Sequence, residues 1–430
     1  MNLIWFRNDL RVADNLALQQ ACNGGKVLAI YCFDPRQFSD LRFGFKKTSQ
    51  YRAQFLIETV TELRQSLSKL NISLLIYHDK PENIIPKLIS QYNINKVYLQ
   101  KEWTSEEKTV ADSVISASSK DVTFKSSYNQ FLIHPEDIPY NDFKQIPEVF
   151  TNFRKACEEH LKIRPLIPIP EPLPKDNLVK NDTNVVELTD FGLDNFQLDY
   201  RSAFPWKGGE LQALARVDEY LWKTKKISVY KKTRNGLIGK DYSSKFSAWL
   251  ANGSISPRII YWHIKQFEKE IVKNESTYWL FFELLWRDFF KYVSLKHKNK
   301  IFQLKGISNE SYQWENSKET LKMWIEGRTT SSFINANLKE LALTGWMSNR
   351  GRQNVASFWS KELKQDWRIG ASYFESMLID YDVHSNWCNW MYTSGVGNDP
   401  RNRKFNPSRQ ATVYDPQGKF QNLWLQPTLF

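Results

Sequence analysis

The chain has 430 residues, a formal net charge of +12 and an aromatic content of 14%, with 16 tryptophans. This length allows two domains with separate cores, and no apolar run approaches the about 20 residues that a membrane span needs. The opening MNLIWFRNDLR carries charge within its apolar run, unlike a signal or transit peptide. We expect a cytoplasmic monomer with no membrane partner, whose positive charge attracts polyanions such as nucleic acid.

The cysteines predict neither a disulfide framework nor a metal site. Cys22, Cys32, Cys157 and Cys388 show no paired spacing. We interpret Cys388, which lies beside a group of aromatic residues, as a small buried thiol.

Strand-like and helical patterns alternate over the first 130 residues. Apolar runs typical of strands cover residues 3–6, 26–33, 72–77, 96–100 and 121–125. The helical patterns between them begin with Asp14 as an N-cap, near Ser49, and with Pro81 in the first turn. This order predicts an α/β domain with a doubly wound, Rossmann-like sheet of five parallel strands. No GxGxxG follows the first run, so no classical dinucleotide site is expected there.

The remainder of the chain divides into an irregular part and a helical part. Residues 135–174 contain eight of the 17 prolines and predict an extended connector that runs along the surface. From about residue 208 long helical patterns dominate, and fourteen of the 16 tryptophans follow residue 200. The sequence therefore predicts an α/β domain joined by a proline-rich connector to an all-helical domain.

Residues 241–258, DYSSKFSAWLANGSISPR, are rich in small hydroxyl side chains beside a lysine. Ser243, Ser244, Lys245 and Ser247 are typical of a helix N-terminus, whose free N–H groups bind phosphate. An ordinary helix cap explains the same residues, so both interpretations stay open.

The helical pattern STYWLFFELLWRDFFKYV is apolar on nearly every face, which predicts that it is buried or lines a cavity. Four residues in this apolar pattern carry a charge or an indole N–H: Glu283, Trp286, Arg287 and Asp288. Glu283 and Arg287 are four residues apart and could form a structural ion pair. Alternatively, an acid among aromatic rings presents its oxygens to a heterocycle that enters the cavity. The residues support both interpretations equally.

Groups that suit phosphates and heterocycle edges gather at residues 344–359, TGWMSNRGRQNVASFW. Arg350 and Arg352 offer guanidinium forks, and Asn349 and Gln353 offer amides. A solvated basic helix face is the structural alternative.

Residues 378–392, LIDYDVHSNWCNWMY, combine carboxylates, an amide and large aromatic rings. Asp380 and Asp382 have no companion at metal-ligand spacing, and we interpret His384 as a surface or satisfied histidine. The aspartates and Asn386 can hydrogen-bond the edge of a flavin. Nearby indoles, which are easily oxidised, could pass electrons to it, although core packing is the default for any single tryptophan.

Taken together, these stretches resemble the photolyase/cryptochrome flavoproteins over nearly the whole chain. IWFRNDLRVADN, DYSSKFSAWL, FFELLWRDFF, WMSNRGRQNVASF and DYDVHSNWCNW follow that family's order and spacing. FGFKKT, SNRGRQNVASF and NWMYTSGVGNDPR are similar to the DASH cryptochromes in particular. The resemblance implies an α/β antenna domain at residues 1–130, a connector at 131–207 and a helical domain at 208–430 that binds FAD.

The resemblance also implies the cofactor contacts. The FAD phosphates and the bend of the molecule would lie against Tyr230, Ser243, Ser244, Lys245 and Ser247. The ribityl chain and ring would be surrounded by Trp279, Arg287, Asn349, Arg352, Asp380, Asp382 and Asn386, the last of these near flavin N5.

The implied activity is light-dependent repair of cyclobutane pyrimidine dimers by an electron from reduced FAD. Glu283 would contact the dimer and Trp286 would stack on it, after the lesion has left the base stack. The tryptophan electron chain of the family would run from Trp390 through Trp367 to Trp314 and solvent.

Two wall residues refine the implied substrate. Gln353 and Tyr392 stand where similar double-strand photolyases carry Met and Trp, which implies repair mainly in single-stranded DNA. The two histidines of photolyases for the other pyrimidine photoproduct are absent at Asn349 and Gln353. Basic residues at the cavity mouth would hold the phosphates: Lys231, Arg234, Lys240, Arg350, Arg401 and Arg403. Whether the protein also binds RNA stays open.

An antenna chromophore is implied for the first domain, 5,10-methenyltetrahydrofolate in many DASH proteins, with Glu102 as its binding acid. The surrounding stretch QKEWTSEE departs from the sequence usual in DASH cryptochromes. The alternative function is a blue-light photoreceptor that signals through flavin photoreduction along the same tryptophans. Receptors of that kind usually carry a long C-terminal tail. A nucleic-acid-binding protein without flavin is a third hypothesis.

Overall fold

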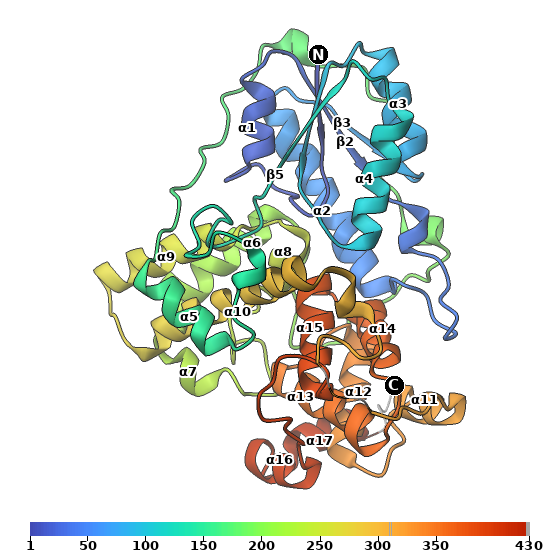
Figure 1. The fold of residues 1–430 in the computed structure, drawn as a ribbon, viewed down its shortest axis with the longest axis vertical. Helices are drawn as coiled ribbons and strands as arrows, with labels where there is room; N and C mark the ends of the chain where they lie inside the picture. Colours follow the sequence, from blue (N-terminus) through green and yellow to red (C-terminus); the bar gives the residue numbers. More distant parts are fainter. Residues whose placement is uncertain (309, 311, 427–430) are drawn as a thin grey trace.

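The computed structural model describes residues 1–308, 310 and 312–426. In Figure 1 the α/β domain, coloured blue to teal, forms one end of the molecule, and helices coloured yellow to red form the other. Within the described residues, no helix combines the length and the hydropathy that crossing a bilayer requires.

Five parallel strands form a single sheet in the order β3-β2-β1-β4-β5. In the central part, Leu3 of β1 lies between Leu28 of β2 and Val97 of β4. The predicted doubly wound sheet is confirmed, with strands at Asn2–Trp5 (β1), Val27–Cys32 (β2), Leu74–Tyr77 (β3), Lys96–Gln100 (β4) and Thr123–Ser127 (β5).

Helices cover both faces of this sheet, which is why β1 and β2 are buried along their whole length. One apolar cluster joins the sheet to α1 (Leu16–Cys22) and α2 (Gln50–Lys69). A second cluster, on the opposite face, joins it to α3 (Pro81–Gln91) and α4 (Ser105–Ala117).

The first helix begins one residue later than predicted. Asn15, not Asp14, is the N-cap of α1 and accepts a hydrogen bond from the Leu18 amide. Asp14 instead has a φ of 52° and a buried carboxylate, which binds Ser256 Oγ at 2.5 Å and Arg258 Nη2 at 2.8 Å. Asp14, which was expected to cap a local helix, therefore links the α/β domain to the helical domain.

The connector touches both domains, as Figure 1 shows in green and teal. Its helix α5 (Phe150–Glu159) packs on α10 of the helical domain. Farther along, the Leu173 amide donates to Leu70 O at 3.0 Å, and the Phe191 ring stacks on Phe38 at 3.8 Å. The connector thus returns along the α/β domain before the chain enters the remaining helices.

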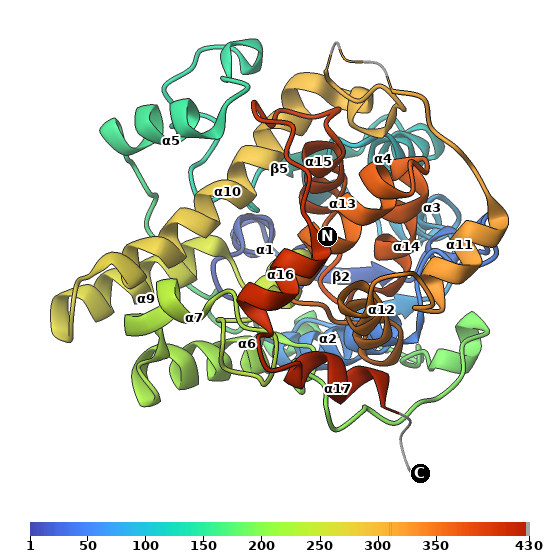
Figure 2. The same ribbon diagram turned by 90° about the horizontal axis from the view of Figure 1, so that it is seen from below.

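The helical domain is organised around α10 (Glu275–His297), whose buried residues face a large apolar cluster. Figure 2 views this end, where α13 and α15 lie side by side. Phe420 and Trp424 of α17 pack on Phe333 and Ala336 of α12. The other helices are α6 (Glu210–Val217), α7 (Tyr230–Thr233), α8 (Ser247–Asn252), α9 (Pro257–Glu270), α11 (Lys318–Ile325), α12 (Ser332–Thr344), α13 (Asn349–Ser357), α14 (Trp367–Met377), α15 (Val383–Ser394), α16 (Pro407–Tyr414) and α17 (Lys419–Leu425).

Candidate active site

A pocket of about 100 Å³ lies between α13, α14 and α15. Asn349 and Arg352 come from α13, Asn386 and Trp390 from α15, and Asp380 from the loop that joins α14 to α15. All five were predicted to contact the flavin or to supply it with electrons. The structure brings them together in one place.

Two side chains hold the Asp380 carboxylate in this pocket. Ser247 Oγ donates to Asp380 Oδ2 at 2.6 Å, and Arg352 Nη2 donates to both carboxylate oxygens at 2.9 and 3.0 Å. Residues predicted to hold the phosphates, the ring and the ribityl chain are therefore linked to one another directly.

Asp382 has a structural role as well as a place beside the pocket. Its Oδ1 accepts a hydrogen bond from the Ser385 amide at 2.8 Å and caps α15, while Oδ2 pairs with Lys291 Nζ at 3.0 Å. Burial raises the pKa of Asp382, but the Lys291 ammonium and the helix amide together hold it well below its usual range. A charged Asp382 therefore fixes the start of the helix that carries Asn386 and Trp390.

The hydroxyl-rich stretch forms a loop that leads into the short helix α8. Lys245 has a φ of 65° and is only 2% exposed, and its Nζ lies 3.3 Å from the centroid of the Tyr242 ring. Among the described residues, no acceptor receives a hydrogen bond from Lys245 Nζ. Burial lowers its pKa well below the usual range. Because a buried ammonium without a partner is costly, this loop with Ser243, Ser244 and the buried Tyr230 fits an anionic group such as phosphate.

Arg287 and Glu283 do not form the ion pair that their spacing allows. Arg287 donates to the backbone oxygens of Gln130 and Leu250 at 2.6 and 3.0 Å, whereas Glu283 pairs with Arg234 at 2.9 Å. The interpretation of Glu283 and Arg287 as a structural pair is therefore wrong, and Glu283 keeps its place on a cavity wall.

That cavity has a volume of about 400 Å³ and lies beside the pocket between α13, α14 and α15, which we call the predicted flavin pocket. Asn349 and Gln353 line both spaces. Glu283 and Trp286, predicted to contact the dimer, line this cavity, as do the predicted wall residues Gln353 and Tyr392. Asn349, predicted to contact the flavin, lines it as well.

A residue of the connector packs against the aromatic wall of the cavity. Phe150 of α5 stacks on Trp286 with ring centroids 3.7 Å apart, and the Tyr392 ring meets Trp286 edge-on at 6.0 Å. Burial raises the pKa of Glu283, and the Arg234 guanidinium opposes this rise. The wall thus presents the rings of Trp286 and Tyr392 together with the Glu283 carboxyl group, whose pKa burial and Arg234 shift in opposite directions.

Three of the six predicted phosphate-binding residues line this cavity: Arg234, Arg350 and Arg403. Arg350 is held by Gln353 Oε1 at 2.9 Å and Asn235 Oδ1 at 3.0 Å. The other three lie outside the lining. Lys231 pairs with Glu275, Lys240 pairs with Glu219, and Arg401 is exposed.

The predicted electron donors differ in burial. Trp390 and Trp367 are buried, and Trp314 is partly exposed. Trp390 packs against Phe374 and Trp324, whereas Trp314 packs against Tyr312. The Trp279 ring, predicted to contact FAD, stacks on Phe282 at 4.8 Å and lies below Lys231.

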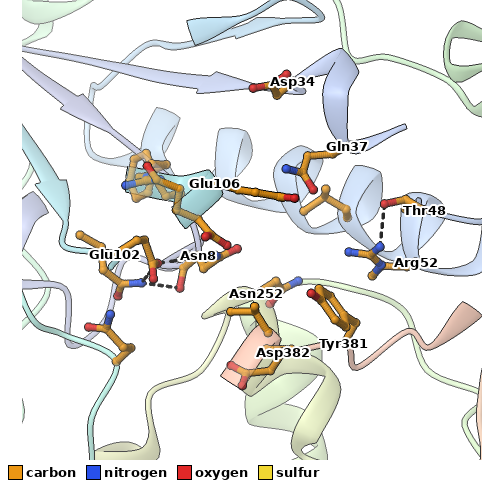
Figure 3. A pocket seen from close by; sticks show the side chains of 18 of the residues that line it. Asn8, Asp34, Gln37, Thr48, Arg52, Glu102, Glu106, Asn252, Tyr381 and Asp382 are labelled. Carbon is orange, nitrogen blue, oxygen red and sulfur yellow. Dashed lines mark hydrogen bonds between the residues drawn. The ribbon is translucent and has the colours of Figure 1, made fainter. Parts of the chain in front are cut away.

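A third cavity, of about 210 Å³, lies between the domains at the carboxyl ends of β1, β2 and β4 (Figure 3). Glu102 is on its wall and accepts a hydrogen bond from Gln100 Nε2 at 2.8 Å. In Figure 3, Glu102 and Asn8 lie together, while Tyr381 and Asp382 close the cavity from the helical domain. Burial raises the pKa of Glu107, also on this wall, to about 7.

Sequence reasoning missed most of the groups around this third cavity. Gln100 is the last residue of β4, and Asp34 and Asn8 follow the ends of β2 and β1 by two and three residues. In a doubly wound sheet, ligands bind outside the carboxyl ends of the strands, so these positions could have been singled out. Asp399, in the dimer cavity, lies within the quoted stretch NWMYTSGVGNDPR but carried no signal of its own.

Family models and relatives agree on one class of protein. A model for DNA photolyase matches residues 2–175, and one for the FAD binding domain of DNA photolyase matches residues 279–429. Cryptochrome DASH of Gloeobacter violaceus is 46% identical over 98% of this chain and 85% of its own. The crystal structure of a Synechocystis cryptochrome gives a TM-score of 0.94 at 44% identity, over 99% of this chain and 88% of that one. A bacterial class III photolyase from Agrobacterium tumefaciens gives 0.81 at 25% identity, over 99% and 86%.

The chain belongs to the photolyase/cryptochrome family. This confirms the resemblance and its similarity to DASH cryptochromes. FAD is the cofactor of the helical domain. Lys245, whose Nζ has no hydrogen-bond acceptor among the described residues, fits its phosphates, and the cluster around Asp380 fits its polar rim. The predicted flavin pocket adjoins the larger cavity, because Asn349 and Gln353 line both.

Proposed function

We propose that this protein repairs cyclobutane pyrimidine dimers in single-stranded DNA when illuminated. The observation that carries the proposal is that the cavity lined by the predicted dimer-binding residues adjoins the predicted flavin pocket, since Asn349 and Gln353 line both. When bound and reduced, FAD supplies on illumination the electron that opens the cyclobutane ring.

The chain's own residues bind and orient the lesion. Trp286, held by Phe150 on one side, offers its ring to the stacked pyrimidines. The Glu283 carboxylate accepts hydrogen bonds from pyrimidine N3–H groups. Because the cavity excludes bulk water on the side that Trp286 and Tyr392 cover, these polar contacts are stronger than in solvent.

Binding of the flanking backbone falls to the arginines at the cavity. Arg234, Arg350 and Arg403 line it, and two of them already make ion pairs with Glu283 and Asp399. A phosphate competes for these guanidinium groups and frees Glu283 for the base. Such contacts position the strand without reading its sequence.

Single-stranded substrate is favoured by the polar wall. Gln353 and Tyr392 stack less strongly than Met and Trp would, so less binding energy offsets the cost of extracting a dimer from a duplex. We further propose that the cavity between the domains holds a folate antenna, with Glu102 accepting hydrogen bonds from its heterocycle.

The test compares repair of matched dimer-containing oligonucleotides, single-stranded and duplex, by reduced protein in light and in darkness. We expect light-dependent restoration that is faster on the single strand. Equal yields in light and darkness would refute repair and leave the photoreceptor alternative. For the antenna, Glu102→Gln should lower the folate absorbance that co-purifies with the protein, while the flavin absorbance stays unchanged.

A further inference from the structure

Asp399 lies in the loop between α15 and α16 and lines the same cavity as Glu283 and Trp286. Among the described residues of that lining, Glu283 and Asp399 are the two carboxylates. The Asp399 side chain is only 2% exposed. Because a buried carboxylate is costly unless donors surround it, the groups that satisfy Asp399 indicate what it does.

The first donors are backbone amides of the same loop. Asp399 Oδ1 accepts a hydrogen bond from the Arg401 amide at 3.1 Å, and Oδ2 accepts one from the Arg403 amide at 3.5 Å. Arg403 Nε also lies 3.9 Å from Asp399 Oδ2. Aspartate often stabilises a turn in this way. Here the turn carries Arg403, so Asp399 determines where that guanidinium group enters the cavity.

The remaining donor is the phenol of Tyr392 on the cavity wall. Burial raises the pKa of Tyr392, and the Asp399 carboxylate raises it further by its charge and by accepting a hydrogen bond from the phenol, while Arg403 opposes the rise. The same ring meets Trp286 edge-on, with centroids 6.0 Å apart and planes at 88°. A ring that is attached to the backbone at one end and hydrogen-bonded at the other keeps one orientation.

The loop of Asp399 is also tied to the segment that supports the other aromatic wall. Asn398 Nδ2 donates a hydrogen bond to Glu148 O at 2.8 Å. Two residues farther along the connector, the Phe150 ring stacks on Trp286 at 3.7 Å. The Trp286 ring and the loop that holds Tyr392 are therefore fixed relative to each other before any ligand binds.

We propose that Asp399 is a positioning residue for lesion recognition, whose carboxylate orients both the Tyr392 ring toward the damaged bases and the Arg403 guanidinium toward their backbone. A ring that is ordered in advance costs less free energy to bind against, so this contact favours a dimer that enters the cavity. An undamaged strand, whose bases stay outside, uses only Arg403. Asp399 thus contributes to the discrimination between damaged and undamaged DNA.

This inference rests on the proposed function, because it takes the dimer as the ligand of the cavity, but its test does not need repair. Binding of the FAD-loaded protein is measured in darkness by fluorescence anisotropy. The ligands are two single-stranded oligonucleotides of one sequence, with and without a dimer. The selectivity is the Kd for the undamaged strand divided by the Kd for the damaged strand.

Two single variants separate the ring from the guanidinium group. Tyr392→Phe keeps the ring and removes the hydroxyl, so the selectivity should fall by about 2- to 12-fold, the range for one aromatic contact, while the undamaged strand binds as before. Asp399→Ala should lower the selectivity by the same factor and should also weaken binding of the undamaged strand, because Arg403 is released. The double variant should be no less selective than Asp399→Ala, since both changes break one hydrogen bond.

The matched control is Asp199→Ala in the connector. Asp199 accepts a hydrogen bond from the Arg201 amide at 2.9 Å and pairs with its guanidinium at 2.6 Å, but lies outside the cavity, so both Kd values should hold. Flavin absorbance and melting temperature establish that each variant is folded and loaded.

Three outcomes overturn the proposal: a wild-type protein that does not distinguish the two strands, an Asp399→Ala protein with unchanged selectivity, and losses that multiply in the double variant. If Asp399→Ala does not fold, Tyr392→Phe decides alone, and unchanged selectivity in that variant overturns the proposal. A protein that binds selectively in darkness but shows no repair in light refutes the proposed function and leaves the role of Asp399 standing.

Discussion

At the residue scale, the polarity of the dimer cavity depends on two side chains. Gln353 is tied to Arg350 by a hydrogen bond of 2.9 Å, and Tyr392 meets Trp286 edge-on. Both therefore connect the lesion site to groups that hold the backbone or the stacking ring. Their replacement should change substrate preference more than catalysis itself.

The double change Gln353→Met and Tyr392→Trp should raise repair of duplex DNA relative to single strands. A larger aromatic wall adds stacking energy that offsets dimer extraction. A gain of about 1 kcal/mol, the lower end for one stacked base, corresponds to about a fivefold higher ratio of kcat/KM values. The measurement is initial repair rate on both substrates, with each single variant as control. An unchanged ratio would show that the wall does not set strand preference.

A buried acid beside the phosphate loop should make stability depend on pH. Glu340 is 1% exposed, and burial raises its pKa from 4.5 to about 8. The folded state therefore favours the protonated acid, whose contribution is complete below pH 4.5 and is lost as pH rises toward 8.

Glu340→Gln should flatten this dependence, because glutamine does not titrate. Between these two pH values the wild-type free energy of unfolding should fall by up to about 1.4 kcal/mol per pH unit more steeply than that of the variant. Urea unfolding at a series of pH values measures both slopes. Parallel curves would contradict a raised pKa at Glu340.

At the scale of elements, α10 and α15 each bury one face in the core and turn another face toward a cavity. On α10, Trp286 and Arg287 follow Glu283 by three and four residues, so the three side chains share the face toward the dimer cavity. On α15, Asn386 and Trp390 face the flavin pocket one turn apart. The connector helix α5 completes this arrangement, because Phe150 supports the Trp286 ring.

Phe150→Ala should loosen Trp286 and weaken binding of dimer-containing single strands. A lost aromatic pair of about 0.5–1.5 kcal/mol corresponds to an increase in Kd of about 2- to 12-fold. Fluorescence anisotropy on damaged and undamaged oligonucleotides measures the effect. Affinity for the undamaged strand should hold, since the phosphate contacts remain, and an equal loss on both strands would point to general unfolding of this wall.

At the scale of the whole molecule, the two domains are joined by buried polar contacts. Asp14, in the loop after β1, binds Ser256 and Arg258 of the helical domain, and Glu210 accepts hydrogen bonds from the Val12 and Ala13 amides at 2.7 and 2.9 Å. The cavity between the domains lies next to this joint. Its shape therefore depends on how firmly the joint holds.

Asp14→Asn should destabilise the protein strongly, because it leaves the Arg258 guanidinium buried without a counter-charge. Breaking such a pair costs about 3–5 kcal/mol. Asparagine tolerates the positive φ at this position, so the effect isolates the charge. Denaturant unfolding followed by circular dichroism measures the loss. The matched control is Asp176→Asn, whose partner Lys26 is exposed and which should cost about 1 kcal/mol or less.

Local pattern was enough to determine the order and type of most elements. Alternating apolar runs and helical periods specify burial along the chain, so the parallel sheet, the proline-rich connector and the helical domain could be predicted. The motifs that suggested a flavin site also carried over, because Asn349, Arg352, Asp380 and Asn386 do share one pocket.

Only the tertiary structure decided which of these groups are partners. Glu283 pairs with Arg234 and not with Arg287, Asp14 reaches Arg258, and Trp387 joins Trp367 to Tyr381. Periodicity reports which face of an element is buried, but not what packs on that face. Contacts between residues far apart in the chain are set by the packing of whole elements, and so these partners became visible only in the folded molecule.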